Sequence, residues 1–316
     1  MTKFLITGGA GFIGSNFCSY MVKKYPLDSF ICFDKLTYAG SLDFLKGILQ
    51  APNFKFIQGD ICDTASVKSL FEQEKFDIVV NFAAETHVDR SIEAPFVFVE
   101  SNVVGVQVLL EACRCYGIQR FHQISTDEVY GDLPIESKER KFKEEDALHP
   151  SSPYSASKAA ADLLVLSYQR TFGVPVTISR CTNNYGPNQN EEKLIPLVIQ
   201  KACNNEFIPV YGTGENVRDW IYVLDHCRAI DLILKKGKLG EIYNISGYNE
   251  KSNLTIIKLI LDKLQRPYSL ISFVEDRKGH DLRYAVSSEK IRNLGWYPQY
   301  EFEEYLSKLI WQAQKK

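Results

Sequence analysis

Short apolar runs alternate with segments of helical periodicity over the first 180 residues of this chain. The runs, among them KFLITG, SFICFD and FDIVVNFAA, are apolar at nearly every position instead of every second one. Strands of that kind are covered on both faces. Between them we expect helices from Gly14 and Thr64, a short helix after SFICFD, and helices over 96–116 and 153–172. The pattern predicts an α/β fold with a doubly wound parallel sheet.

The composition of the chain changes after about residue 180, where loops rich in Asn, Pro and Gly appear, such as CTNNYGPNQNEEKLIP and VYGTGENVRDW. The total of 316 residues also exceeds the usual size of one core. We therefore expect two domains: residues 1–180, to which the chain returns near 218–247, and a smaller mixed α/β domain over 181–316.

Composition excludes several classes of partner. The formal charge of −2 supplies no basic field for nucleic acid or an anionic membrane surface. The start MTKFLITGG lacks an apolar signal region, and we expect no apolar run as long as a membrane span. These features predict a cytoplasmic protein. Eight cysteines without CxxC spacing are expected to be mostly buried free thiols, with a metal or redox role for Cys113 and Cys115 as the less favoured reading.

The first strand runs into TGGAGFIG, with glycines at 8, 11 and 14. Gly8 permits a tight turn, Gly11 lets a pyrophosphate approach the backbone, and Gly14 lets the first helix pack close to the sheet. The second strand ends about twenty residues later in Asp34, which can accept a hydrogen bond from an adenosine ribose. An acid there repels a 2′-phosphate, so the sequence predicts NAD and disfavours NADP. By the same geometry Asp60 is expected beside the adenine.

A second constellation follows the strand FHQIS. The stretch QISTDEVYG places Asp127 and Glu128 at a strand end, directly after Thr126. Farther on, SSPYSASKAAADLL places Tyr154 and Lys158 four residues apart, on one helical face. A nearby ammonium favours a phenolate, so we expect this pair to exchange a proton with a substrate hydroxyl. Together with the glycine motif, these residues predict a site that oxidises a hydroxyl group.

These motifs resemble those of the extended short-chain dehydrogenases/reductases, and most closely the nucleotide-sugar 4,6-dehydratases. The similar stretches cover nearly the whole chain and include NFAAETHVDRSIEAP, ISTDEVYGDLP, NNYGPNQNEEKLIPL, VYGTGENVRDWIYVLDHCRAI and DRKGHDLRYA. Three positions depart from the family pattern: Ser246 replaces a glycine, Leu282 an arginine and Thr182 a serine. The C-terminal extension of longer members is also absent. The resemblance implies a Rossmann domain that binds NAD, followed by a substrate-binding domain.

The resemblance also implies a reaction, the dehydration of a nucleoside-diphosphate hexose to a 4-keto-6-deoxy sugar. Tyr154 is then the base that assists oxidation at carbon 4, with Thr126 and Lys158 polarising it. Asp127 becomes the acid for the departing oxygen of carbon 6, and Glu128 the base for the proton of carbon 5. Two alternatives remain open. A nucleotide-sugar 4-epimerase typically lacks the acid pair, and a cofactor-binding protein without turnover would be expected to lose one of these residues.

We expect dTDP-glucose as substrate and keep UDP-glucose and UDP-N-acetylglucosamine open, since nothing in the sequence assigns the contact with the base. The resemblance assigns the substrate to Thr86, Thr126, Asn183, Lys193, Leu194, Pro209, Val210, Tyr211, Arg218, Asn253, Arg277 and His280. NAD is expected against Gly8, Gly11, Phe12, Ile13, Gly14, Asp34, Lys35, Leu36, Thr37, Asp60, Ile61, Phe82, Ala83, Ala84, Glu85, Thr86, Ser101, Tyr154, Lys158 and Asn184. Five scattered histidines predict no metal site.

A homodimer is the expected assembly. The helices FVFVESNVVGVQVLLEACRCYG and AAADLLVLSYQRTFG carry apolar residues around more of their circumference than one sheet contact needs. The resemblance implies the same. The alternative is that each helix covers its neighbour within one chain.

Overall fold

A parallel sheet of seven strands forms the larger layer of the molecule in the computed structural model, which describes residues 1–277 and 279–315. In spatial order its strands are β10 (Ile242–Ile245), β6 (Val176–Cys181), β5 (Arg120–Thr126), β4 (Ile78–Asn81), β1 (Lys3–Thr7), β2 (Ser29–Asp34) and β3 (Phe54–Gln58). All six neighbouring pairs are parallel. The strand order reverses between β1 and β4, and such a switch point opens a crevice at the carboxyl ends of the strands. The predicted doubly wound fold is confirmed.

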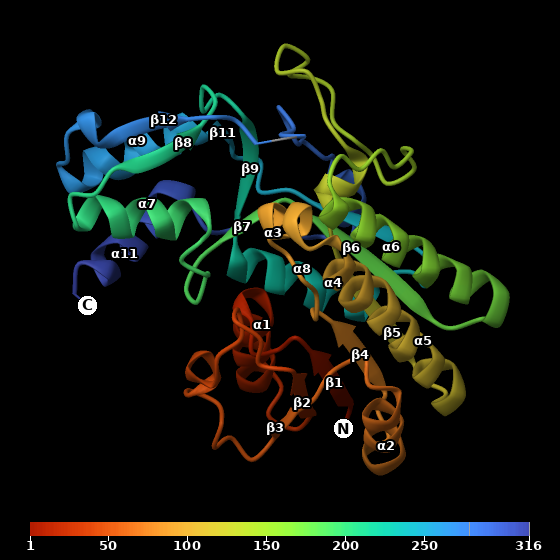
Figure 1. The fold of residues 1–316 in the computed structure, drawn as a ribbon. Helices are drawn as coiled ribbons and strands as arrows, with labels where there is room; N and C mark the ends of the chain where they lie inside the picture. Colours follow the sequence, from red (N-terminus) through yellow and green to blue (C-terminus); the bar gives the residue numbers. More distant parts are fainter. Residues whose placement is uncertain (278, 316) are drawn as a thin grey trace.

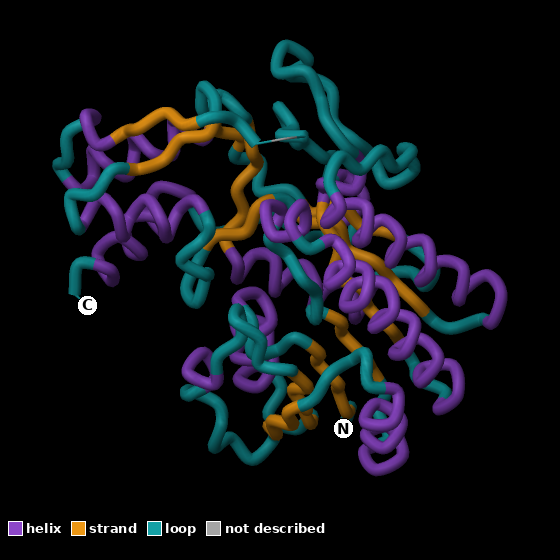
Figure 2. The backbone as a smooth tube through the Cα atoms, in the orientation of Figure 1, coloured by secondary structure: helices purple, strands orange, loops and turns teal. Residues whose placement is uncertain are grey.

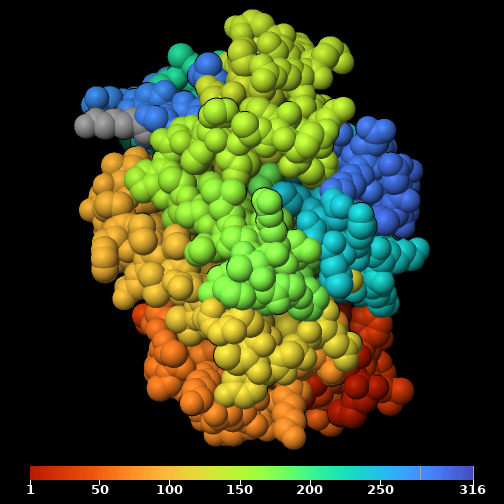
Figure 3. Space-filling view, turned by 90° about the vertical axis from the view of Figure 1, so that its right-hand side faces the viewer, coloured from red at the N-terminus to blue at the C-terminus, as the bar shows by residue number. Residues whose placement is uncertain are grey.

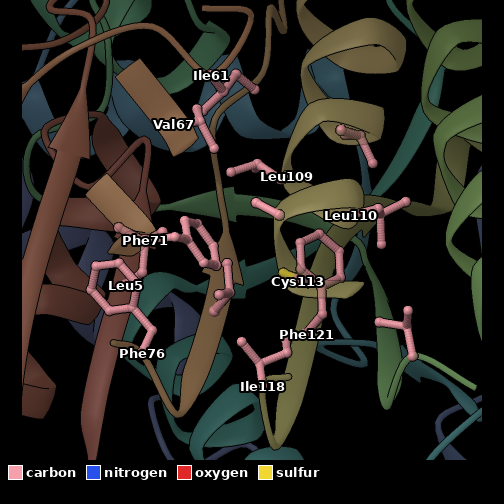
Figure 4. Packing of buried hydrophobic residues seen from close by; sticks show 14 of the residues in the cluster. Leu5, Ile61, Val67, Phe71, Phe76, Leu109, Leu110, Cys113, Ile118 and Phe121 are labelled. Carbon is pink, nitrogen blue, oxygen red and sulfur yellow. The ribbon is translucent and has the colours of Figure 1, made fainter. Parts of the chain in front are cut away.

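Helices cover both faces of this sheet (Figure 1). One face packs against α2 (Thr64–Glu74), α5 (Gly105–Tyr116) and α6 (Pro153–Phe172) through a buried core that Figure 4 shows from close by, with Phe121 of β5 beside Cys113 of α5. The other face packs against α1 (Phe12–Lys24) and α8 (Val223–Lys236). Burial on both faces explains why the strands read as continuous apolar runs.

The second lobe is smaller and more irregular (Figure 2). It contains a sheet of β11 (Glu250–Ser252), β9 (Val217–Tyr222) and β7 (Asn183–Tyr185), and a pair formed by β12 (Ile271–Val274) and β8 (Ile208–Tyr211). Helices α7 (Leu194–Cys203), α9 (Asn253–Leu264) and α11 (Phe302–Ala313) complete its core. Between β9 and β11 the chain returns through α8 and β10 to the large sheet. We propose that these lobes are the two predicted domains.

Shorter helices complete the chain. They are η1 (Leu42–Leu45), α3 (Val88–Glu93), α4 (Pro95–Val99), the π-helical turn η2 (Glu100–Val104), η3 (Asp127–Tyr130), η4 (Tyr268–Leu270) and α10 (Glu289–Asn293). The helices predicted from Thr64 and over 153–172 are confirmed. The first helix begins at Phe12, two residues before the predicted Gly14, because the turn that starts at Gly8 closes at Gly11, which is the N-cap.

One expectation from the sequence is wrong. The helical segment Pro95–Tyr116 is 22 residues long and its most apolar 18-residue window has a mean hydropathy of 1.5, so by length and composition it could cross a membrane. The predicted helix over 96–116 is in fact α4, the η2 turn and α5 in succession. Packing within the chain explains part of this apolar character, since 44% of the most apolar window of the segment is buried inside the protein, against α2 and α6. In Figure 3 this segment, coloured orange to yellow, lies beside the green of α6 on one face of the molecule.

Candidate active site

A cavity of about 310 Å³ opens at the carboxyl ends of β1, β2, β4 and β5. This volume is at the lower end of the range typical of small-molecule pockets. The glycine loop after β1 forms one wall, and the ends of β5 and α6 form another. The switch point of the sheet therefore coincides with this cavity.

Each of the three loop glycines is required for a different reason. Gly8 has φ +67°, and a Cβ there would lie 2.4 Å from the backbone nitrogen of Ala83. A Cβ on Gly14 would lie 2.2 Å from the carbonyl oxygen of Gly8, so α1 packs directly on the loop. At Gly11 the nearest atom, the same carbonyl oxygen, is 3.4 Å away. The backbone at Gly11 thus has room on its outer side, which fits the close approach of a pyrophosphate.

Asp34 at the end of β2 is held by the loops on either side. Its carboxylate accepts hydrogen bonds from the backbone N–H of Ala10 at 2.9 Å and of Leu36 at 2.8 Å. Burial raises the pKa of Asp34 above its usual range. Beside it, Lys35 pairs with Asp60 at 2.6 Å, where an adenine is expected. The acceptor set fits the ribose of a dinucleotide.

Asp127 and Glu128 begin η3, directly after β5. The hydroxyl of Thr126 caps this turn, since it accepts the N–H of Glu128 at 3.3 Å and donates to Asp127 Oδ1 at 3.2 Å. The other oxygen of Asp127 is buried without a hydrogen-bond partner. Burial, followed by the neighbouring charges of Glu128 and Asp219, raises the pKa of Asp127 well above its usual range. A carboxyl group in such surroundings is suited to hold a proton.

Glu128 has a different electrostatic environment. Burial raises its pKa, but the charges of Arg218, Lys193 and Arg277 oppose that shift. Asp127 has a single opposing cation, Arg218, among the main contributions. Two adjacent carboxyl groups therefore differ in how strongly they retain a proton, as a division into acid and base requires.

The Tyr154–Lys158 pair lies on α6, and both side chains are buried. Their arrangement differs from our expectation that the ammonium favours the phenolate. Lys158 Nζ donates to the carbonyl oxygen of Ile124 at 2.7 Å. Burial, and then the charge of Glu128, raises the pKa of Tyr154 well above its usual value, and burial lowers the pKa of Lys158. The physical reason is that desolvation disfavours the charged form of both groups.

Most of the predicted residues line this one cavity. From the cofactor set they are Gly8, Gly11, Phe12, Ile13, Gly14, Asp34, Lys35, Thr37, Asp60, Ile61, Phe82, Ala83, Ala84, Glu85, Thr86, Ser101, Tyr154, Lys158 and Asn184. The acids join Thr126, Asn183 and Lys193 there. Leu36 does not line the cavity, because it has φ +58° and its side chain packs against the core under α1. Its backbone N–H contributes instead, by fixing Asp34.

The remaining predicted substrate residues lie outside this cavity, namely Leu194, Pro209, Val210, Tyr211, Arg218, Asn253, Arg277 and His280. Several of them lie close together: Arg277 is stacked 4.7 Å from the ring centre of Tyr211, which also contacts His280. Arg218 is buried and stacked 4.2 Å from the ring of Tyr284. Since the charges of Arg218 and Arg277 influence Glu128, this second cluster adjoins the acid pair.

Other residues of the cavity wall were not predicted from the sequence. They are Phe33, Ala39, Gly40, Gly59, Ile124, Ser125, Cys181, Thr182, Gln189, Asn190 and Glu192. Gln189 to Glu192 belong to the polar loop NQNEE, whose composition indicated a loop but not its position over the cavity. Among the described residues, no group of three or more His, Cys, Asp or Glu side chains is placed to hold a metal ion.

Comparison with known proteins decides the family. Residues 5–309 match the protein family described as GDP-mannose 4,6 dehydratase. The chain belongs to this family. Among its relatives, a low-salt glycan biosynthesis protein of Haloferax volcanii is 51% identical over 306 residues, which cover 97% of this chain and 96% of that protein. Within the family, dTDP-glucose 4,6-dehydratase 1 of Escherichia coli K12 is 46% identical over 331 residues, covering 98% and 91% of the two chains.

Solved structures agree with the family assignment. The dTDP-glucose 4,6-dehydratase DesIV of Streptomyces venezuelae, with NAD bound, superimposes with a TM-score of 0.95 at 43% identity and covers 100% of this chain and 98% of its own. A UDP-glucose 4-epimerase of Thermotoga maritima has a TM-score of 0.91 at 27% identity, with 99% of both chains covered. The resemblance inferred from the motifs is confirmed.

Proposed function

We propose that this protein is an NAD-dependent hydro-lyase that converts dTDP-glucose into the 4-keto-6-deoxy sugar nucleotide. One observation carries the proposal: buried Asp127 and half-buried Glu128 lie in the same cavity as Tyr154 and Lys158. A protein that only oxidises a hydroxyl has no use for two more titrating groups there. The relatives named dTDP-glucose 4,6-dehydratase support the substrate.

Oxidation depends on Tyr154, which takes the proton from the hydroxyl on carbon 4 while Thr126 and Lys158 orient its oxygen. NAD, when bound, would hold the hydride of carbon 4 until it is returned to carbon 6, and Glu128 gives a proton back to carbon 5 in that last step. The glycine loop and Asp34 hold this cofactor. A phenol with a raised pKa acts as a base more readily beside a positive charge, and Lys158 lies four residues away on the same helix face.

Elimination uses the other pair. A ketone at carbon 4 makes the proton on carbon 5 acidic. Glu128, whose rise in pKa is opposed by three nearby cations, is the group that removes this proton. Asp127 retains its proton and gives it to the oxygen that leaves carbon 6 as water. The diphosphate of the substrate would be held by the planar donor groups of Arg218 and Arg277 and the point charge of Lys193.

A 4-epimerase is the second candidate, because the epimerase of Thermotoga maritima shares the fold over the whole chain. Incubation with dTDP-glucose, UDP-glucose and UDP-N-acetylglucosamine separates the possibilities. We expect a 4-keto-6-deoxy product that is lighter by one water, detected by mass spectrometry. A product of unchanged mass with inverted carbon 4 would support the epimerase instead.

Two further variants assign the individual steps. Tyr154→Phe should give neither reduced nicotinamide nor keto sugar, since oxidation is blocked. Glu128→Gln should still oxidise carbon 4 but should suppress the uptake of solvent deuterium at carbon 5. Wild-type deuterium uptake in Glu128→Gln would show that another group serves as the base.

We infer that the enzyme works as a homodimer in the cytoplasm. The inference of a dimer is supported by apolar side chains that stay exposed on α4 and α6, with Phe96 75% and Leu163 60% exposed. The eight free cysteines, most of them buried, suit a reducing compartment. Sedimentation at micromolar concentration should give twice the chain mass of 36.1 kDa. Phe96→Glu should shift the species toward monomer, whereas Leu27→Glu, at a site 82% exposed elsewhere, should not.

A further inference from the structure

A buried ion pair that the proposed chemistry does not use lies one helical turn beyond Lys158. Asp162 of α6 and Arg180 of β6 are 0% and 2% exposed. Arg180 Nε donates to Asp162 Oδ2 at 2.9 Å, and the hydroxyl of Ser125 donates to the same oxygen at 3.0 Å. Ser125 and Arg180 are also register partners in neighbouring strands. The pair therefore connects α6 to the strand end that precedes the acid pair.

The guanidinium of Arg180 extends the connection to η3. It lies 4.8 Å from the ring centre of Tyr130, which is the last residue of the turn that begins with Asp127. The hydroxyl of Tyr130 donates to Asn244 Oδ1 on β10 at 2.8 Å. One buried chain of contacts thus links the helix of Tyr154 and Lys158 to the turn of the two acids.

Stability alone does not account for this pair. Asp162 Oδ1 and Arg180 Nη1 are buried and have no hydrogen-bond partner. Removing two charges from water often costs as much as their attraction returns, and well-packed apolar side chains commonly replace such a pair without loss of stability. What apolar side chains cannot supply is a directional link between α6 and η3.

We propose that Asp162 and Arg180 are positioning residues that fix α6, with Tyr154 and Lys158, relative to η3, with Asp127 and Glu128. The inference rests on the proposed function, in which one sugar must reach both pairs during a single turnover. Reactions of this kind are sensitive to position, since a shift of about 1 Å can lower a rate about a hundredfold.

The double variant Asp162→Leu/Arg180→Met tests this role. We expect a melting temperature no lower than that of the wild type, retained NAD, a KM within about twofold, and a kcat lowered at least about tenfold. The matched control is Lys3→Met/Glu74→Leu, which removes a 2.6 Å ion pair at the opposite end of the sheet and should leave kcat unchanged. A folded double variant with wild-type kcat, or with only KM changed, would overturn the proposal.

A second comparison covers the case in which the double variant does not fold. Tyr130→Phe keeps the ring under Arg180 and should retain most of the activity, whereas Tyr130→Leu removes the ring and should lower kcat. Equal kcat values in these two variants would contradict the link. If the wild type forms no keto sugar from any sugar nucleotide, the proposed function fails. Amide hydrogen exchange in η3 then still tests the positioning role, because it should quicken in Tyr130→Leu and not in Tyr130→Phe.

Discussion

Asp127 and Glu128 are neighbours in sequence, yet the fold places them in different electrostatic environments. Asp127 is 3% exposed, and one of its oxygens has no partner, so its proton is retained. Glu128 is half-buried and lies within the influence of three cations. Adjacent residues of a turn point in different directions, and this alone lets two identical functional groups take opposite roles.

The first prediction concerns the order of the steps. Asp127→Asn should still oxidise the sugar, because the hydride leaves carbon 4 without help from this group, but the loss of water should slow by about two to four powers of ten. Stopped-flow absorbance should then show reduced nicotinamide accumulating on the enzyme. An Asp127→Asn enzyme that turns over at the wild-type rate would refute the assignment.

The same substitution should stabilise the folded protein at neutral pH. The pKa of Asp127 is raised in the folded state, so above about pH 4 the unfolded chain loses this proton while the folded protein keeps it. The free energy of unfolding therefore falls as the pH rises, and Asp127→Asn should remove a penalty of about 1–3 kcal/mol. In thermal melts from pH 4 to pH 8, the melting temperature of Asp127→Asn should exceed that of the wild type by an amount that grows with pH. Asp43→Asn, at an exposed carboxylate, should show no such trend.

At the scale of elements, the sequence predicted the large sheet better than the small lobe. Strands β1, β2, β4, β5 and β6 are buried along nearly their whole length, so their apolar runs carried the signal. Strands β7 and β11 have three residues each, too few for any periodicity to register. The substrate residues outside the cavity belong to this lobe, and their positions depend on tertiary packing. The raised pKa of Tyr154 was also not predicted, because desolvation depends on what surrounds a side chain.

The glycine loop supplies a prediction at this scale. Gly11→Ala should fold normally, since the new methyl group would lie 3.4 Å from its nearest neighbour, the carbonyl oxygen of Gly8. The same methyl group would occupy the outer side of the loop, where the pyrophosphate is expected. The purified variant should therefore contain little NAD, measured after heat denaturation. Adding NAD should not change its melting temperature. Gly47→Ala, with no atom within 4 Å, is the control and should keep its cofactor. Full NAD occupancy in Gly11→Ala would place the pyrophosphate elsewhere.

The candidate active-site cavity lies between the ends of the large sheet and the loop that leads into the smaller lobe. In the proposed reaction the hydride is taken and returned within one turnover, so release of the cofactor serves no step. We predict that NAD survives purification at close to one equivalent per chain. The supernatant of heat-denatured protein should contain NAD, and a supernatant with NADP alone would contradict the reading of Asp34.

The return of the chain to the large sheet has a practical consequence for anyone who wishes to divide this protein. β10 pairs with β6 and covers its outer edge, and α8 covers a face of the same sheet. A fragment that ends near residue 180 would lack both elements. It would leave β6 as an open edge beside an uncovered apolar surface, a combination that promotes edge-to-edge aggregation. We therefore expect residues 1–180 expressed alone to be insoluble, whereas a fragment extended through Ile245 would retain the complete sheet.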